Sequence, residues 1–183
     1  MKKAVVGSLL LAWAAQSAHA IIININARSN DLGNPVEVFL EAGTYSVANI
    51  GRLDGGLFDG WSNWASTTCG SAAGCPITSP TTFTGWRSAY NVISPDLADV
   101  KVDGTTLPEL SAIPGFPEIF SDYFAVTSTT TRYHVDDTMV YSSASTALAN
   151  ARDSMFTLTS AGFVGFAIFD VPISDNRGGV SLE

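Results

Sequence analysis

The C-terminal stretch "IFDVPISDNRGGVSLE" gathers oxygen-bearing side chains between two apolar runs. Asp170 closes the first run, and Asp175 and Asn176 stand just before the second. Ca²⁺ takes about six to eight oxygen ligands from carboxylates, amides and backbone carbonyls, and the Ser174 carbonyl could join this set. Two carboxylates held close together repel each other without a cation. The spacing therefore fits a calcium site, and it also fits a plain turn, because Asp and Asn are common turn residues.

Catalytic chemistry has less support. His134, in "RYHVDD", is the one histidine beyond the N-terminal leader, and it could form a triad with Asp136 or Asp137 and any of many serines. The chain contains no G-x-S-x-G nucleophile elbow, no phosphate-binding glycine loop and no zinc-helix motif. We therefore interpret His134 as a strand residue and expect no enzyme, with a secreted hydrolase as the alternative.

The elements that would position these residues are mostly strands. Period-two alternation and β-branched or aromatic residues predict strands in 21–27, 34–51 (two strands), 132–141, 154–160, 163–170 and 179–183. The turn "EAG" separates the two strands of 34–51, and "SAG" is short enough to mark a hairpin between the last two strands before the terminal one.

Helix signals are few. Residues 142–153 form the best helix candidate, with Ser142 or Ser145 as the cap. Residues 94–99 read as one helical turn that begins at Ser94 and Pro95.

The middle of the chain, 54–120, is rich in Gly, Ser, Thr and Pro, and about 85–131 reads as a long loop-rich insert. Its large aromatic residues should anchor these loops: Trp61, Trp64, Trp86 and Phe116. Many short strands with little helix predict a single antiparallel all-β sandwich domain over 21–183, with one short helix and long loops.

Residues 1–20 have the pattern of a secretory signal peptide. Lys2 and Lys3 precede an apolar run over 4–15, and "AHA" at 18–20 is a small-x-small cleavage signature. The run is shorter than the roughly 18 apolar residues of a spanning helix, and no later stretch reaches that length. The sequence thus predicts an exported chain that begins near Ile21, with an uncleaved anchor as the alternative.

Without Lys2 and Lys3, seven basic residues face 17 acidic ones, a net charge of −10. Such a surface repels nucleic acid and anionic membranes, because both need a cationic face. Cys69 and Cys75 should form a disulfide in an exported chain. A zinc site is not supported, because no histidine or third cysteine lies near them in the sequence.

The C-terminal segment resembles the calcium loop of the soluble bacterial galactose-binding lectins. The matching residues are "DVP" from Asp170, then Asp175 and Asn176, then Gly178. The family's "Gly-Trp" also has a counterpart in "GWSNW", where Trp64 would give a backbone carbonyl to the ion. The resemblance implies a small β-sandwich, calcium-bridged sugar binding and oligomerisation.

Three departures from the lectin pattern stand in the sequence. The loop is shorter by two residues between Asp170 and Asp175, Asp replaces the first Asn, and the sugar-contacting histidine has no match, since His134 lies far downstream. The resemblance covers about 21–64 and 145–183.

Other stretches, "FTLTSAGFVGFAIFD", "TALANA" and "GWSNW", are similar to exported bacterial proteins of the PEP-CTERM type, whose sorting tail is absent here. Those proteins are mostly envelope- or matrix-associated β-sandwiches. Together the two resemblances imply a secreted protein that binds carbohydrate or matrix through Ca²⁺, with Trp61 or Trp64 shaping the pocket beside Asp170 and Asn176. A structural or adhesive envelope protein is the alternative, and a homo-oligomer is compatible with both.

Overall fold

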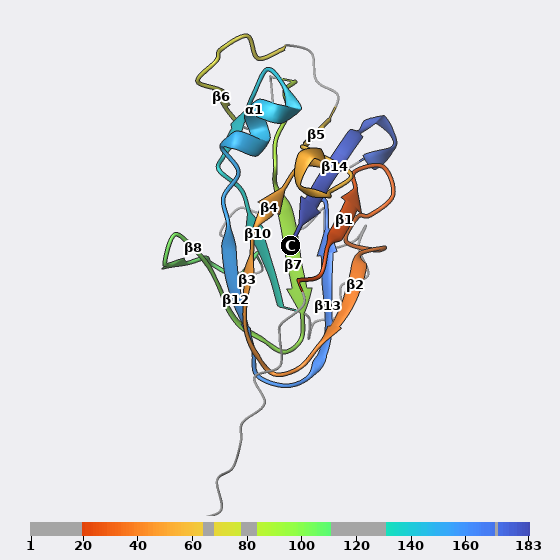
Figure 1. The fold of residues 1–183 in the computed structure, drawn as a ribbon, viewed down its shortest axis with the longest axis vertical. Helices are drawn as coiled ribbons and strands as arrows, with labels where there is room; N and C mark the ends of the chain where they lie inside the picture. The colour runs from red at the N-terminus through yellow and green to blue at the C-terminus, as the bar shows by residue number, and fades with distance from the viewer. Residues whose placement is uncertain (1–19, 64–67, 78–83, 111–130, 171) are drawn as a thin grey trace, which may run out of the picture.

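The computed structural model describes residues 20–63, 68–77, 84–110, 131–170 and 172–183. Two four-stranded antiparallel sheets enclose a common core (Figure 1). The first sheet has the order β10 (Thr131–Val135), β7 (Tyr90–Ser94), β13 (Gly162–Ala167), β2 (Val36–Leu40). The second has the order β3 (Gly43–Val47), β12 (Ser154–Leu158), β8 (Leu97–Val102), β9 (Thr105–Thr106). The expected all-β sandwich is confirmed.

A third sheet extends the second one. It has the order β1 (Ile23–Asn26), β14 (Arg177–Leu182), β4 (Asn49–Ile50), and β5 (Trp61–Ser62) also pairs with β14. Ala48 separates β3 from β4, and its backbone exchanges hydrogen bonds of 2.9 and 3.0 Å with Glu183. One continuous stretch, β3–β4, therefore pairs with β12 along one half and with β14 along the other.

Three short connections cross from one sheet to the other at the same end of the sandwich. They join β2 to β3, β7 to β8 and β12 to β13, and lie at the lower end of Figure 1. The hairpin expected at "SAG" is therefore wrong, because that turn joins strands of different sheets. The two strands expected around "EAG" are confirmed as β2 and β3. The helical turn expected over 94–99 is also wrong, since β8 begins at Leu97.

Polar contacts bind these arches to one another. The Asp96 carbonyl accepts a hydrogen bond from the Thr159 N–H at 2.9 Å, and the Asp96 carboxylate accepts one from the Ser160 hydroxyl at 2.6 Å. These bonds satisfy backbone and side-chain groups that the turns leave without strand partners. They fix the arch after β7 against the arch after β12.

The core lies between the two sheets, as period-two alternation requires. Phe156 on β12 and Phe166 on β13 are each 1% exposed, and their rings meet edge to face with centroids 6.2 Å apart. Tyr45 on β3 stacks on Phe156 at 5.3 Å. The fully buried aliphatic partners include Ile25, Val92, Val100, Val164 and Leu182. This core holds the two sheets at a fixed separation.

The helical segments are short. Helix α1 spans Ala144–Ala149, and the 3₁₀ turns η1 (Arg52–Asp54) and η4 (Ile173–Asp175) lie in loops. The expected helix is confirmed, but its cap is Ser143, whose hydroxyl accepts the Thr146 N–H at 3.1 Å. Among the described residues, no helix combines the length and apolar character that crossing a membrane requires.

The expected loop-rich insert is wrong in its first part. Strands β7, β8 and β9 lie within 85–131, and β7 pairs with both β10 and β13 inside the first sheet. Residues 111–130, with Phe116, fall outside the described residues.

The disulfide between Cys69 and Cys75 is confirmed, with Cα atoms 5.8 Å apart. Cys75 belongs to the short strand β6 (Cys75–Pro76), which pairs with β11 (Met139–Val140). The bridge therefore fixes a loop next to the segment that follows β10.

Candidate functional site

The C-terminal loop runs from the end of β13 to the start of β14. Asp170 is half-buried, whereas Ser174 and Asp175 are exposed and Asn176 is buried. The turn η4 carries Ser174 and Asp175, so both face solvent. The structure thus gathers the predicted calcium residues in one loop, but it separates the exposed ones from the buried Asn176.

Asn176 is the polar residue of the loop whose side chain is buried. It is 2% exposed, and its Nδ2 donates a hydrogen bond to the Ala27 carbonyl at 3.0 Å. This bond attaches the loop to the end of β1. Its Oδ1 is buried and has no hydrogen-bond partner. A buried amide oxygen without a partner is costly and is the kind of atom that a cation or water satisfies.

Carboxylates are sparse in this loop. Among the described residues, no group of three or more His, Cys, Asp and Glu side chains is placed to hold a metal ion. A cation here would depend on the Asn176 amide oxygen, one or both aspartates and backbone carbonyls, a donor set that suits Ca²⁺. Trp64, the expected carbonyl donor, lies outside the described residues.

Trp61 is not placed to stack on a ligand, so its expected pocket role is wrong. It is 1% exposed, its Nε1 donates to the Ala89 carbonyl at 2.8 Å, and the Arg87 guanidinium lies 5.1 Å from its ring centroid. Backbone bonds of 2.8 and 2.9 Å also join Trp61 to Arg87. Trp61 is a core residue whose polar atom is satisfied inside the protein.

Trp86 is the half-buried aromatic residue beside the loop. The Arg177 guanidinium lies 5.8 Å from the Trp86 ring centroid, and Arg177 follows Asn176 directly. The Arg177 Nε also donates to the Ser62 hydroxyl at 3.2 Å. Sequence reasoning predicts only an anchoring role for Trp86, because nothing in its spacing places it next to residues about ninety positions away.

A second polar cluster surrounds His134 on β10. Its Nδ1 lies 3.2 Å from the Asn91 Oδ1, and its Nε2 lies 3.4 Å from the Asp136 carboxylate. Asp136 also pairs with the Arg87 guanidinium, and both side chains are about nine-tenths buried. The Phe169 and His134 rings lie edge to face, with centroids 6.5 Å apart. The structure therefore brings His134 next to the segment that carries Asp170.

Among the described residues, this cluster is not arranged as a catalytic triad. Each imidazole nitrogen already faces an acceptor, and the Asn91 Nδ2 donates to the Ala167 carbonyl at 3.2 Å, which fixes the amide orientation. A general base needs a free nitrogen that faces a nucleophile. The described residues place no hydroxyl or thiol in that position.

Two neighbouring carboxyls in the cluster titrate in opposite directions. Burial alone would raise the pKa of Asp136, but the hydrogen bond from His134 and the charge of Arg87 hold that pKa well below its usual range. For Asp137, burial raises the pKa despite the hydrogen bond that the Tyr141 hydroxyl donates at 2.5 Å. Burial also raises the pKa of Tyr141. The surroundings therefore favour the ionised form of Asp136 and disfavour that of Asp137.

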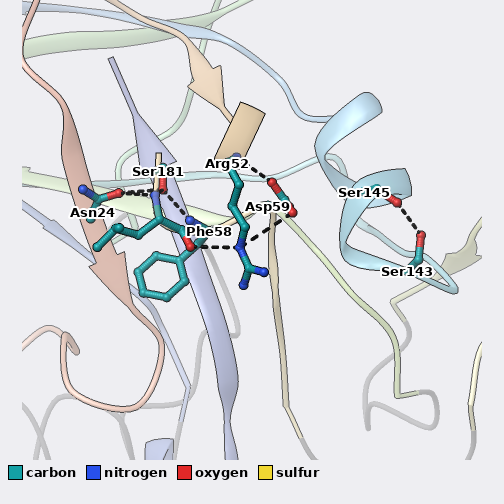
Figure 2. Close-up of polar contacts among 8 residues, drawn as sticks. Asn24, Arg52, Phe58, Asp59, Ser143, Ser145 and Ser181 are labelled. Atoms are coloured by element: carbon teal, nitrogen blue, oxygen red, sulfur yellow. Dashed lines mark hydrogen bonds and ion pairs between the residues drawn. The ribbon is translucent and has the colours of Figure 1, made fainter. Parts of the chain in front are cut away.

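The loop between β4 and β5 presents apolar side chains on a fixed backbone. The buried Ser181 hydroxyl accepts the N–H groups of Leu57 and Phe58 at 3.0 and 2.9 Å and donates to the Asn24 Oδ1 at 2.7 Å (Figure 2). Leu57 is nevertheless 62% exposed, and Leu53 is fully exposed. These hydrogen bonds therefore fix the loop backbone while the side chains of Leu53 and Leu57 stay exposed to solvent.

No protein family, curated protein or solved structure matches this chain. The fold and the arrangement of these side chains are therefore the basis for assigning a function.

Proposed function

We propose that this chain is an exported, non-enzymatic β-sandwich protein that binds a carbohydrate or an extracellular-matrix component through Ca²⁺ held by the C-terminal loop. The observation that carries the proposal is the buried Asn176 Oδ1, which has no hydrogen-bond partner and lies next to Asp175 in sequence. An amide oxygen with one aspartate next to it in the sequence is a suitable start for a calcium shell. The secretory leader and the disulfide support an exported protein.

In this proposal Asn176, Asp170 and Asp175 supply side-chain oxygens and Ser174 supplies a carbonyl. Open positions on the ion would take sugar hydroxyls. Trp86 replaces Trp61 as the aromatic wall, because Trp86 is half-buried beside the loop whereas Trp61 is enclosed. Arg177, over the Trp86 ring, could donate hydrogen bonds to a sugar or to an acidic matrix polysaccharide.

Thermal unfolding of the mature chain with calcium and with a chelator tests the ion. Specific binding stabilises the folded state by about 2.7 kcal/mol at a hundredfold excess over Kd, which corresponds to roughly 5–10 °C for a domain of this size. Asp175→Ala should reduce the shift. Asp54→Ala, which removes an exposed acid from the 3₁₀ turn η1, should leave it intact. Equal unfolding temperatures with and without calcium would remove the ion from the proposal.

A glycan array probed with and without calcium tests the ligand. Calcium-dependent binding that Asp175→Ala weakens and Asp54→Ala does not would support a lectin-like role. Binding that survives the chelator would place the sugar elsewhere on the protein.

The second candidate is a structural or adhesive envelope protein without a ligand site. It is favoured by the exposed Leu53 and Leu57 on their fixed loop and by the solvent-facing Phe39–Phe163 pair, whose ring centroids are 5.4 Å apart. Apolar side chains held in water mark contact surfaces. A silent array together with concentration-dependent self-association that Leu53→Ser abolishes would favour this role.

A further inference from the structure

The sandwich core is open along one side. An apolar groove of about 460 Å³ lies between the edge strands β2 and β3, lined by Ile23, Val38, Leu40, Tyr45, Phe156 and Leu182. The inward side chains of β2 are only half-buried, whereas Val164 and Phe166 on the adjacent strand β13 are 0% and 1% exposed. The groove therefore exposes part of the core at the edge of the fold.

The groove has the place and direction of a missing strand. Among the described strands, β3 pairs with β12 alone, so its other edge has no strand partner. On that same side, β14 pairs with β4 and reaches Glu183, which bonds to Ala48 and lines the groove. A strand continuing the line of β14 would lie antiparallel to β3, opposite Val47 first and Gly43 last.

We propose that this groove binds an extended peptide strand of a partner protein, which adds to the free edge of β3. Unpaired backbone groups along a strand edge are a template for such an addition, and pockets for alternate side chains give it specificity. A fatty acyl chain would also fill an apolar groove, but it would leave the N–H and C=O groups of the β3 edge without partners. The backbone edge therefore favours a peptide.

The geometry defines the residues of that peptide. Positions opposite Val47, Tyr45 and Gly43 point into the groove and should be apolar, because directly opposed residues project to the same face. The position opposite Gly43 meets no side chain and should take a large residue. Positions opposite Ser46 and Thr44, which are exposed, should be polar.

Charge defines the start of the strand. The residue that precedes the position opposite Val47 would lie near Glu183, an exposed acidic residue that lines the groove. A lysine, arginine or α-ammonium group there complements this carboxylate and the net charge of −10 after loss of the leader. The ligand is thus a strand with a basic first residue followed by alternating apolar and polar residues.

The probe is a fluorescein-labelled peptide, Lys-Val-Thr-Ile-Thr-Phe-Lys, titrated against the mature chain by fluorescence anisotropy in a calcium chelator. Its permuted control, Lys-Val-Ile-Thr-Thr-Phe-Lys, has the same composition without the alternation. We expect the control to bind about tenfold more weakly, because a polar residue then enters an apolar pocket. The chelator separates this result from the calcium-dependent function proposed above.

A matched pair of variants on β2 locates the peptide. Val38→Lys places a charge in the groove and should weaken binding about tenfold or more. Phe39→Lys places the same residue on the opposite face of the strand, where Phe39 is 55% exposed, and should change affinity less than about twofold. Glu183→Gln should weaken binding about two- to fivefold, as expected for an exposed ion pair.

Disulfide cross-linking between the peptide and β3 tests the binding site even if the Val38→Lys variant does not fold. In Ser46→Cys, a peptide with cysteine at its third residue should form a disulfide with the protein, and a peptide with cysteine at its fifth residue should react more slowly. Equal affinity for the two peptides, an equal loss in Phe39→Lys, or equal cross-linking at both positions would overturn the proposal. Saturation by decanoate in place of the peptide would overturn it too and identify a lipid groove.

Discussion

The ion pair between Arg87 and Asp136 gives the sharpest test of the buried polar cluster, through the isosteric substitution Asp136→Asn. The side chains of Asp136 and Arg87 are 10% and 12% exposed, so the variant leaves a guanidinium charge nearly desolvated and without its partner. Breaking a buried pair in this way costs about 3–5 kcal/mol. We expect the lower end, about 3 kcal/mol, because Asn retains a hydrogen-bonding oxygen for His134.

Urea unfolding of residues 21–183 with the Cys69–Cys75 disulfide intact measures this loss in the free energy of unfolding. For a domain of this size, about 3 kcal/mol corresponds to a decrease in Tm of roughly 6–12 °C. The double variant Asp136→Asn with Arg87→Met removes both charges and should recover much of the loss, because paired removal avoids the buried unpaired charge. A loss below about 1 kcal/mol in Asp136→Asn, or fully additive single losses, would refute the view that the pair is a buried, coupled unit.

The pH dependence of the free energy of unfolding tests Asp136 independently. Because the folded pKa of Asp136 is lowered, its stabilising contribution is present above the unfolded pKa of about 3.9 and is lost as the pH falls through the folded value. Asp136→Asn should therefore flatten the acid side of the stability profile. Asp137 has a raised pKa, so it stabilises at low pH and loses that effect as the pH rises, and Asp137→Asn should steepen the same limb.

Three further outcomes follow from single contacts. Gly178→Ala should destabilise the fold by more than about 2 kcal/mol in urea unfolding, because φ of Gly178 is 78° and a Cβ there would overlap the Gly60 carbonyl oxygen. The control variant Gly104→Ala, where φ is 76° and the space around the Cβ is open, should cost only about 1 kcal/mol. Reducing the Cys69–Cys75 bridge should lower stability by about 2 kcal/mol in the same assay, since the closed loop is short. Trp61→Phe should cost about 1–3 kcal/mol and leave any glycan-array signal unchanged after correction for folded fraction, because its Nε1 bonds to the Ala89 carbonyl in the core.

Local signals in the sequence predict the elements well and their partners poorly. The alternation over 34–51 and 154–170 correctly marks β2, β3, β12 and β13 as strands with an apolar face. The alternation does not show which sheet each strand joins, because a turn of two or three residues can form either a hairpin within one sheet or an arch between two sheets. The choice depends on partners such as β7 and β8, which lie in a stretch whose Gly and Pro content resembles a loop.

The candidate site shows the same limit at the level of side chains. The Asp and Asn residues of the C-terminal loop are visible in the sequence because they are close together, and they do share one loop. The buried polar cluster brings together Arg87, Asn91 and His134, and the first and last of these are more than forty residues apart in the sequence. They meet only because β7 pairs with β10. The register between β7 and β10 decides which of these side chains meet, and the local spacing of residues does not predict that register.

The open edge beside β3 has consequences for the association of the folded protein with other chains. A half-open core with an unpaired strand edge is a site for uncontrolled association, which natural sheets avoid with charges, short edges or a covering element. The outward residues of β3 are the small polar Thr44 and Ser46, which do not block a partner strand. The fold leaves an apolar groove and an accessible strand edge at the same place, and the acidic Glu183 lines that groove. In the proposed role, this arrangement accepts a complementary strand and disfavours a strand that begins with an acidic residue.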